Sequence, residues 1–333
     1  MICNITKLLN EKYFRINKRP KVSIISAVYN REKYLIRFIN SIRSQKFSDI
    51  EIIFIDDFSK DRSVKIIENF KKIDERIILI KNKKNKGTFI CRNLGVLKSK
   101  GEYLVLPDPD DILSPDIIDI SYKFAKKYNY EMIRFNIYVG KGKIFFNDIV
   151  TNLESRPVFQ PQLSLYLFYG LGKLRQIDFN VANKFVKRVS FVRALNYLNK
   201  YYLKIFMVSF EDGLINFFLY RTVKSFYFLK KLGYYYIRNK KSYDEIQPAR
   251  ITQNLKFRFL YLKLVFEYTK STLIEKDISN CLLSIIYKDL PKKINYTDFS
   301  FYNNIINIYL QSQYIKIEHK KYLNKLKKFY FNL

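Results

Sequence analysis

Residues 101–111 read GEYLVLPDPDD, a short apolar run followed by Asp108, Asp110 and Asp111. Carboxylates this close repel one another unless a cation lies among them. The D-x-D spacing of Asp108 and Asp110 suits Mg²⁺ or Mn²⁺, because these ions prefer oxygen ligands and leave room for phosphate oxygens. An acidic surface turn after a strand is the alternative, and the spacing alone does not decide between the two.

Strand-like and helix-like segments alternate on both sides of this stretch. Apolar, β-branched runs predict buried strands over residues 22–28, 50–55, 77–80, 103–106 and 132–138. Segments with one apolar face predict helices between these strands, and Asn30 is expected to cap the first helix. Such alternation is typical of an α/β fold with a mostly parallel sheet and flanking helices.

Polar clusters follow three strands of this predicted sheet. They are Tyr29-Asn30, Asp56-Asp57 and the aspartates of residues 108–111. Ligands of parallel α/β sheets bind beyond the carboxyl ends of the strands. Three clusters at that edge therefore favour one binding site over three unrelated surface turns.

The alternation weakens from about residue 150. Residues 163–169 and 190–197 look helical, whereas residues 203–208 and 234–237 look like strands. After about residue 250 the pattern is helical, basic and rich in aromatic residues. This pattern predicts a helical C-terminal extension, which either packs on the main domain or lies on a membrane face as a basic amphipathic helix.

The composition bounds the partners and the compartment. A formal net charge of +31 on 333 residues could indicate nucleic acid or an anionic membrane surface, but the basic residues are spread along a chain rich in Lys, Asn and Ile, which favours compositional drift. Three distant cysteines argue against a disulfide framework or a cysteine zinc site and indicate a reducing compartment. Because no signal peptide and no run of about 18 apolar residues is found, we expect a cytoplasmic protein, either free or peripheral at a membrane face.

Several segments resemble glycosyltransferase family 2, whose nucleotide-sugar-binding fold is called GT-A. In the order of the family they are VSIISAVYNREKYLIRFINSIRSQ (22–45), IEIIFIDDFSKDRS (50–63), NKGTFICRNLG (85–95), GEYLVLPDPDDILSP (101–115), NVANKFVKR (180–188), FEDGLINFFLY (210–220) and YYYIRNKKS (234–242). Several motifs in the same order make the resemblance specific, although any one of them alone would be weak.

The resemblance also implies a division of the chain. Residues 1–20 would be an N-terminal extension, and residues 21–242 would be the GT-A domain. Within that domain, residues 21–140 would bind the nucleotide-sugar and residues 141–242 would form the acceptor half. Residues 243–333 would be the basic, aromatic-rich helical C-terminal region.

For the metal, the resemblance implies that Asp110 is the direct ligand of Mn²⁺ or Mg²⁺. Asp108 would follow, on the metal or on the ribose of the donor, and Asp111 would hold the loop. Pro107 and Pro109 depart from the family's usual residues at these positions and stiffen the loop, so they either fix the metal site or distort it.

For the donor, the resemblance implies a nucleoside diphosphate sugar, with a UDP-sugar favoured. Asp57 would accept a hydrogen bond from the uracil edge, supported by Asp56, and Tyr29 would lie against the base. Arg92 would pair with the diphosphate or with an aspartate of the 108–111 cluster. Lys184 would face the diphosphate or the acceptor.

For the acceptor, the resemblance implies that Asp212 is the base that takes the proton of a hydroxyl on a glycan, lipid or protein. Glu211 would orient that base or touch the acceptor. A single in-line displacement would invert the anomeric carbon and add one sugar per encounter, since the chain has no Trp for the Gln-x-x-Arg-Trp segment of processive synthases. A helix-terminal acidic pair is the structural alternative for Glu211 and Asp212.

Two other functions stay open from the sequence. A nucleic-acid-binding protein would use the positive charge and would not need the aspartates, though nucleic acid is the less expected partner. A catalytically inactive glycosyltransferase-like scaffold would bind nucleotide without turnover. The aromatic-rich tail makes a homodimer or a membrane contact a reasonable expectation.

Overall fold

The computed structural model describes residues 19–139, 143–145, 158–159, 180–199, 207 and 211–237. Its strands are β1 (Val22–Val28), β2 (Ile50–Asp56), β3 (Ile77–Lys81), β4 (Tyr103–Val105), β5 (Ile112–Leu113), β6 (Met132–Val139), β7 (Lys143–Phe145), β8 (Val158–Phe159), β9 (Lys184–Lys187) and β10 (Ser225–Tyr236). Its helices are α2 (Glu32–Arg43), α3 (Ser63–Ile73), α4 (Thr88–Lys98), α5 (Ile117–Tyr128), α8 (Arg188–Asn199) and α9 (Glu211–Thr222).

The strands form one mixed sheet in the order β3-β2-β1-β4-β9-β6-β10-β5, with β7 beside β6 and β8 beside β10. The first four strands of this order, β3, β2, β1 and β4, are parallel to one another. Strand β9 is antiparallel to both β4 and β6, and β10 is parallel to β6. The predicted α/β fold is therefore confirmed, and β9 joins the parallel strands of the first half to the second half of the sheet.

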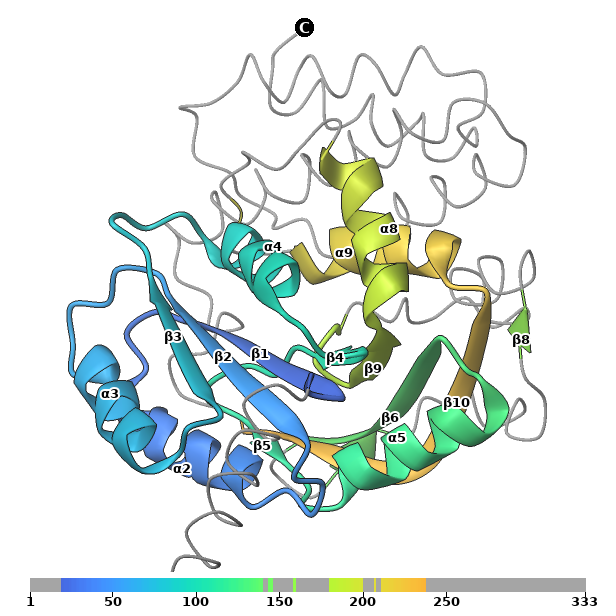
Figure 1. The fold of residues 1–333 in the computed structure, drawn as a ribbon, viewed down its shortest axis with the longest axis horizontal. Helices are drawn as coiled ribbons and strands as arrows, with labels where there is room; N and C mark the ends of the chain where they lie inside the picture. The colour runs from blue at the N-terminus through green and yellow to red at the C-terminus, as the bar shows by residue number, and fades with distance from the viewer. Residues whose placement is uncertain are drawn as a thin grey trace, which may run out of the picture.

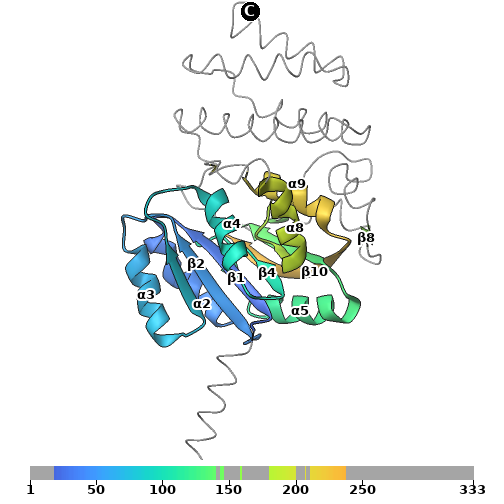
Figure 2. The same cartoon turned by 45° about the horizontal axis from the view of Figure 1, so that its top comes forward.

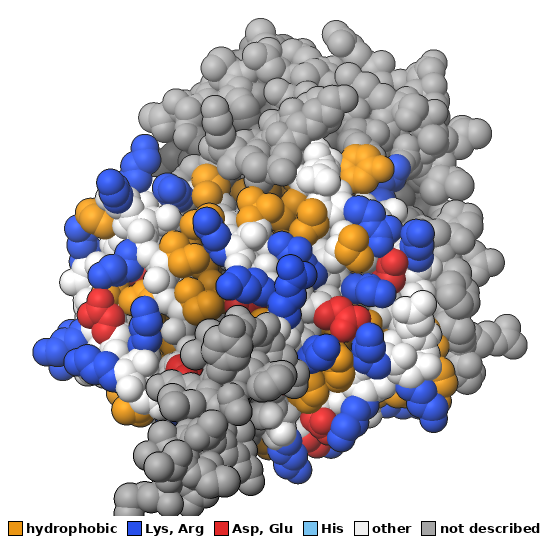
Figure 3. Space-filling model, in the orientation of Figure 1, with side chains coloured by type: hydrophobic (Ala, Val, Ile, Leu, Met, Phe, Trp, Pro, Cys, Tyr) orange, Lys and Arg blue, Asp and Glu red, His pale blue; other side chains and the backbone are white. Residues whose placement is uncertain are grey.

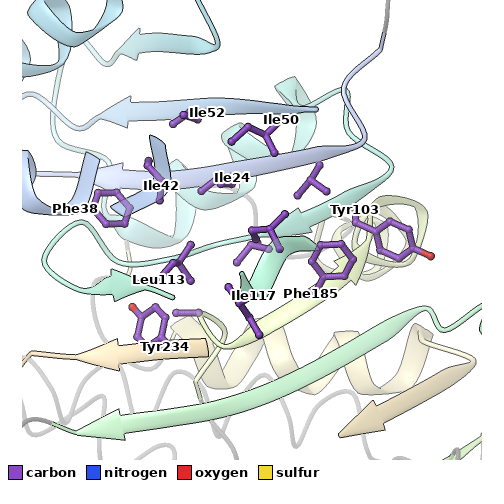
Figure 4. Close-up of a cluster of buried hydrophobic side chains, with 14 of the residues drawn as sticks. Ile24, Phe38, Ile42, Ile50, Ile52, Tyr103, Leu113, Ile117, Phe185 and Tyr234 are labelled. Carbon is purple, nitrogen blue, oxygen red and sulfur yellow. The ribbon is translucent and has the colours of Figure 1, made fainter. Parts of the chain in front are cut away.

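Helices cover both faces of this sheet, with α2, α3 and α5 on one side and α4, α8 and α9 on the other (Figures 1 and 2). On the first side, Ile24 and Ile52 of the strands pack with Phe38 of α2 and Ile117 of α5 in one buried cluster (Figure 4). Successive strand residues point to opposite faces, so the neighbouring isoleucines of β1 and β2 face α4. This two-sided burial explains the continuous apolar runs.

Helix α4 lies directly on the sheet because of Gly95. A methyl group at this position would lie 2.2 Å from Cγ2 of Ile25 and 3.4 Å from Cδ1 of Ile55. A larger side chain would push the helix away, since buried interiors have few voids. Arg92, three residues earlier in α4, is consequently held close to the sheet.

The start of α2 corrects one expectation. Asn30 does not cap the helix: it has a φ of +52°, and α2 begins at Glu32 without a side-chain cap from its own N-cap residue. The loop before α3 supplies the acceptors instead, because Oγ of Ser63 accepts from Arg31 N (2.8 Å) and Oδ2 of Asp61 accepts from Glu32 N (3.0 Å). These bonds tie together the segments that follow β1 and β2.

The second half of the chain is described only in part. The helix expected over 190–197 is present in α8, and the strand expected over 234–237 is the end of the longer β10. The expectations for residues 163–169, for residues 203–208 apart from Met207, and for the region after 250 lie outside the described residues. Among the helices that are described, none has both the length and the apolar character needed to span a bilayer.

The ion pairs of Asp74 make a contribution to the stability of the first half of the chain that can be measured. Its carboxylate accepts hydrogen bonds from Nε of Arg43 (2.9 Å) and from Nε and Nη2 of Arg76 (2.9 and 2.8 Å). The bonds from Arg76 lower the pKa of Asp74 from 3.8 to about 2. A lowered folded-state pKa stabilises the fold above the unfolded pKa, and this stabilisation is lost as the pH falls through the folded pKa.

We expect Asp74→Asn to lower the free energy of unfolding by about 1–2 kcal/mol at neutral pH, after allowance for solvent screening of the partly exposed arginines. The difference from wild type should shrink as the pH falls from about 4.5 to about 2. Urea unfolding at several pH values measures this difference in the free energy of unfolding. A difference that stays constant over this range would show that the ion pairs are not its cause.

Candidate active site

The carboxyl ends of β1, β2 and β4 meet at one edge of the sheet. Val28 pairs with Asp56 in the parallel register, and Asp57 N donates to the carbonyl oxygen of Val28 (2.8 Å). Strand β4 pairs with β1 and leads into residues 107–111, the PDPDD turn. The three polar clusters that the sequence placed at this edge are therefore brought together there.

Asp57 is buried and holds the loop between β3 and α4. Its Oδ1 accepts from Nδ2 of Asn82 (2.9 Å) and from Lys86 N (2.8 Å), and its Oδ2 accepts from Gly87 N (2.8 Å). Gly87 has a φ of +86°, and a methyl group there would lie 2.8 Å from the carbonyl oxygen of Met207. The loop therefore requires glycine at this point, and its course is fixed by Asp57.

Asp56 and Tyr29 lie at the same edge of the sheet as Asp57. Oδ2 of Asp56 accepts from the backbone N–H groups of Phe58 and Ser59 at 3.2 Å each, whereas its buried Oδ1 finds no hydrogen-bond partner among the described residues. A buried acceptor without a donor is costly, which suits a site that a ligand completes. The side chain of Tyr29 is 43% exposed, so its ring is available to a flat ligand.

Asp108 and Asp110 are the partly exposed carboxylates of the PDPDD turn, with 34% and 25% of their side chains exposed. Oδ1 of Asp108 accepts from Nη2 of Arg92 (2.7 Å). Oδ2 of Asp110 lies 3.6 Å from Nε of Arg31, and the carbonyl oxygen of Asp110 accepts from Nη2 of Arg37 (2.7 Å). Guanidinium groups thus surround the two carboxylates.

Asp111 is buried behind the turn. Its Oδ2 accepts from the hydroxyl of Tyr234 (2.5 Å) and its Oδ1 from Ile237 N (2.9 Å). Burial, together with the negative charges of Asp108 and Asp110, raises the pKa of Asp111 above its ordinary value. Asp111 therefore ties the turn to β10.

The acidic side chains of the turn provide oxygen ligands for a metal ion. In the part of the chain that the structure describes, no three His, Cys, Asp or Glu side chains gather as metal ligands. Asp108 and Asp110 alone form a thin, partly exposed set of oxygen donors. Such a set does not fit a closed structural site, but it fits Mg²⁺ or Mn²⁺, which keep water ligands and take phosphate oxygens from a substrate.

Arg92 joins the PDPDD turn to the start of α9. Only 4% of its side chain is exposed, and its guanidinium donates to Asp108, to Oε1 of Glu211 (3.0 Å) and to Oδ1 of Asp212. Burial disfavours its charge, but the carboxylates of Asp212, Asp108 and Glu211 raise the pKa of Arg92 above its ordinary value. One cation therefore holds three carboxylates from two distant segments.

The second carboxylate oxygen of Asp212 also accepts a hydrogen bond. Its Oδ2 accepts from Val181 N (3.2 Å), and 23% of its side chain is exposed. Burial raises the pKa of both Asp212 and Glu211, while the Arg92 charge acts in the opposite direction on both. Lys184 is buried, and its Nζ donates to the carbonyl oxygen of Asn180, the residue before Val181. The Lys184 ammonium also lowers the pKa of Asp212. A carboxylate with a raised pKa and an accessible edge can accept a proton.

The structure thus gathers the predicted site residues along one edge of the sheet and around Arg92. The residues that sequence reasoning missed are those that hold the predicted ones: Arg31, Arg37, Asn82 and Tyr234. Asn82 directly follows β3 and Arg31 is the third residue after β1, so their position after strands was an available signal. No local signal connects Tyr234 with the PDPDD turn.

Comparison with known proteins agrees with this geometry. Residues 23–185 match the family model described as Glycosyl transferase family 2. An uncharacterized glycosyltransferase of Haemophilus influenzae is 36% identical over 133 residues, which are 40% of this chain and 50% of that protein. Glycosyltransferase GlyG of Streptococcus pneumoniae is 31% identical over 117 residues, 35% of this chain and 39% of that protein. The chain therefore spans half or less of these relatives.

The fold is also that of a solved structure. TarS of S. aureus, residues 1–349 in complex with UDP-GlcNAc, superposes with a TM-score of 0.64 at 17% identity, over 90% of this chain and 82% of that chain. At this identity the likeness concerns the fold alone. The predicted family is confirmed for residues 23–185 by the family model, and the predicted GT-A arrangement is confirmed by the fold of TarS.

Proposed function

From the membership of residues 23–185 in glycosyl transferase family 2, we propose that the chain transfers one sugar from a nucleoside diphosphate sugar to an acceptor hydroxyl. The observation that carries the proposal is the Arg92 cluster, in which one guanidinium contacts Asp108 of the donor edge and Glu211 and Asp212 at the start of α9. A transferase needs a site for the leaving diphosphate and a base for the acceptor within reach of each other.

A UDP-sugar is the favoured donor. TarS, which shares the fold, was solved with UDP-GlcNAc. In this chain, Tyr29 would lie against the base, Asp57 would accept from its edge with a remaining lone pair, and the buried Oδ1 of Asp56 would gain a donor nearby. Arg31, which is partly exposed beside Asp110, would supply positive charge near the diphosphate, whereas Arg92 offsets part of the negative charge of the carboxylates around it.

Asp110 and Asp108 would hold Mn²⁺ or Mg²⁺ together with the phosphates of the donor. When bound, such an ion neutralises the charge that develops on the leaving diphosphate. The chain's own contribution is to hold the two carboxylates, through Arg37 on the backbone of Asp110 and Arg92 on the side chain of Asp108.

Asp212 would act as the base. Its carboxylate takes the proton of the acceptor hydroxyl as that oxygen forms a bond to the anomeric carbon, and the bond from this carbon to the diphosphate oxygen breaks with its electron pair. One displacement inverts the anomeric carbon. Glu211 fixes the position of the base through Arg92, and Val181 N fixes it by a direct hydrogen bond. Lys184 would lie near the acceptor.

The acceptor is a hydroxyl of a glycan, a lipid or a protein. A cytoplasmic location, contact of the basic tail with an anionic membrane, and a homodimer complete the proposal. The tail proposed to contact the membrane lies in residues 243–333, which were expected to be helical and which are outside the described residues.

A nucleic-acid-binding protein is the second candidate that the charge suggested. Lys and Arg side chains are scattered over the described part of the face in Figure 3, between acidic and apolar ones. This distribution favours compositional drift over a dedicated phosphate-binding stripe.

The proposal is tested by screening nucleotide sugars with Mn²⁺ and measuring released UDP or GDP. We expect turnover of a UDP-sugar, and a fall of about a hundredfold or more when EDTA removes the metal. Asp110→Asn should raise the Mn²⁺ concentration for half-maximal activity about tenfold, because one of two protein ligands loses its charge.

The matched control is Asp119→Asn, which removes a carboxylate paired with Lys123 on the surface of α5. It should leave the Mn²⁺ dependence unchanged. Full activity in EDTA would contradict the metal, whereas tight nucleic-acid binding with a steep salt dependence and no nucleotide binding would favour the second candidate.

A further inference from the structure

Tyr234 is a buried residue of β10 that the mechanism above does not use. Its ring lies in the core, near Leu113 and Ile117 in Figure 4, and its side chain is fully buried. The pairing of β10 with β6 shifts register between Leu232 and Tyr234. Such bulges redirect a side chain and often occur next to functional sites.

The hydroxyl of Tyr234 bonds the PDPDD turn at two points. It donates to Oδ2 of Asp111 (2.5 Å) and accepts from Asp108 N (3.1 Å). Pro107 and Pro109 have no N–H group, so Asp108 supplies the backbone donor of residues 107–109, and Tyr234 takes it. One hydroxyl therefore fixes both the backbone and a side chain of the turn.

We propose that Tyr234 is a positioning residue of the donor site, which sets the conformation of the PDPDD turn and thereby the affinity for the donor and its metal. The inference rests on the proposed function. Asp108 and Asp110 lie between the two points that the hydroxyl fixes, so the direction of their carboxylates depends on it. Arg92 and Arg37 also hold the turn, but at other atoms. Arg92 contacts the Asp108 side chain, and Arg37 contacts the carbonyl oxygen of Asp110.

Loss of the hydroxyl would leave two groups without their partner. The Asp108 N–H group and Oδ2 of Asp111 would both need water or a new partner. Because Asp111 is buried, bringing water to its carboxylate would be costly. The turn would then relax away from the geometry that two carboxylates need in order to share one cation.

Tyr103 provides a matched control for a purely structural effect. It is as buried as Tyr234, and its hydroxyl donates to the carbonyl oxygen of Tyr130 (3.2 Å), away from the PDPDD turn. Tyr103→Phe and Tyr234→Phe delete the same atom from the same sheet. A difference between the two variants therefore results from where the hydroxyl lies and not from how deeply it is buried.

The experiment compares both variants with the full-length wild-type chain. For Tyr234→Phe we expect hydrogen exchange at the Asp108 amide to be about tenfold faster or more, and the donor KM and the Mn²⁺ concentration for half-maximal activity to rise about tenfold. The value of kcat should change less than about threefold, because the base is untouched. Tyr103→Phe should leave all four quantities near wild type.

Four outcomes would overturn the proposal. Exchange at residues 107–111 that matches Tyr103→Phe would show that the hydroxyl does not hold the turn. Faster exchange with an unchanged donor KM and Mn²⁺ dependence would show that holding the turn does not position the donor. If the wild-type chain binds no nucleotide, the proposed function and the donor-positioning role both fail, whereas normal wild-type turnover with an unaffected Tyr234→Phe removes the positioning role alone.

Discussion

Asp212→Asn is expected to lower the rate of sugar transfer by about 10²–10⁴-fold, the range typical for removal of a general base. The amide cannot take the proton of the acceptor hydroxyl. Its carbonyl oxygen can still accept a hydrogen bond from Arg92, which keeps the tie to the PDPDD turn, while its NH2 group faces Val181 N and loses that bond. The affinity for UDP should therefore stay within about threefold of wild type. Steady-state kinetics and UDP titration measure the two quantities.

Glu211→Gln is the informative neighbour in this experiment. Glu211 is buried against the same guanidinium, so its loss should affect kcat less than the loss of Asp212 if it only orients the base. Full transfer activity in Asp212→Asn would show that the base is elsewhere. Tight UDP-sugar binding by wild type without turnover on any acceptor would favour the inactive scaffold.

Arg92→Met is expected to lower the free energy of unfolding by about 3–5 kcal/mol, since it breaks a buried ionic cluster by removing one partner. Asp108, Glu211 and Asp212 would then face one another without the cation that they share. Transfer activity should fall together with stability. Chemical unfolding at neutral pH gives the first quantity, and donor turnover at a temperature where the variant is folded gives the second.

Arg62→Met is the control for the Arg92 variant. Arg62 forms an ion pair with Glu32, and 79% of its side chain is exposed. Its replacement should leave the free energy of unfolding close to that of wild type, because exposed pairs contribute little. Arg92→Lys keeps the charge but loses the forked geometry, so it should lie between wild type and Arg92→Met. Equal costs for the Arg62 and Arg92 variants would contradict the role of the cluster.

The first half of the fold could be predicted because its signals are local. A strand buried on both faces must be apolar at successive positions, and the run VSIISAV corresponds to β1 at both of its ends. The aspartates after β2 and β4 follow from the same reasoning, since parallel strands end at one edge. The capping role of Asn30 was wrong because the acceptors for α2 come from Asp61 and Ser63, about thirty positions later in the chain.

The connections within the site could not be predicted from local patterns. Arg92 meets Glu211 and Asp212 across 119 and 120 positions, and Tyr234 meets Asp111 across 123. Such contacts depend on sheet order and on a bulge in β10, neither of which leaves a periodic signal. The family resemblance implied roles for the acidic residues and for Arg92, but it did not identify Arg31, Arg37 and Tyr234, which also hold the PDPDD turn.

The contact of Gly95 with Ile25 and Ile55 has a consequence for how the site is held. It lets α4 lie close against β1 and β2, where a larger side chain would push the helix away. The guanidinium that joins the two acidic segments is carried by that helix. The separation of the proposed donor and acceptor groups therefore depends on the packing of α4 against the sheet more than on the surface loops.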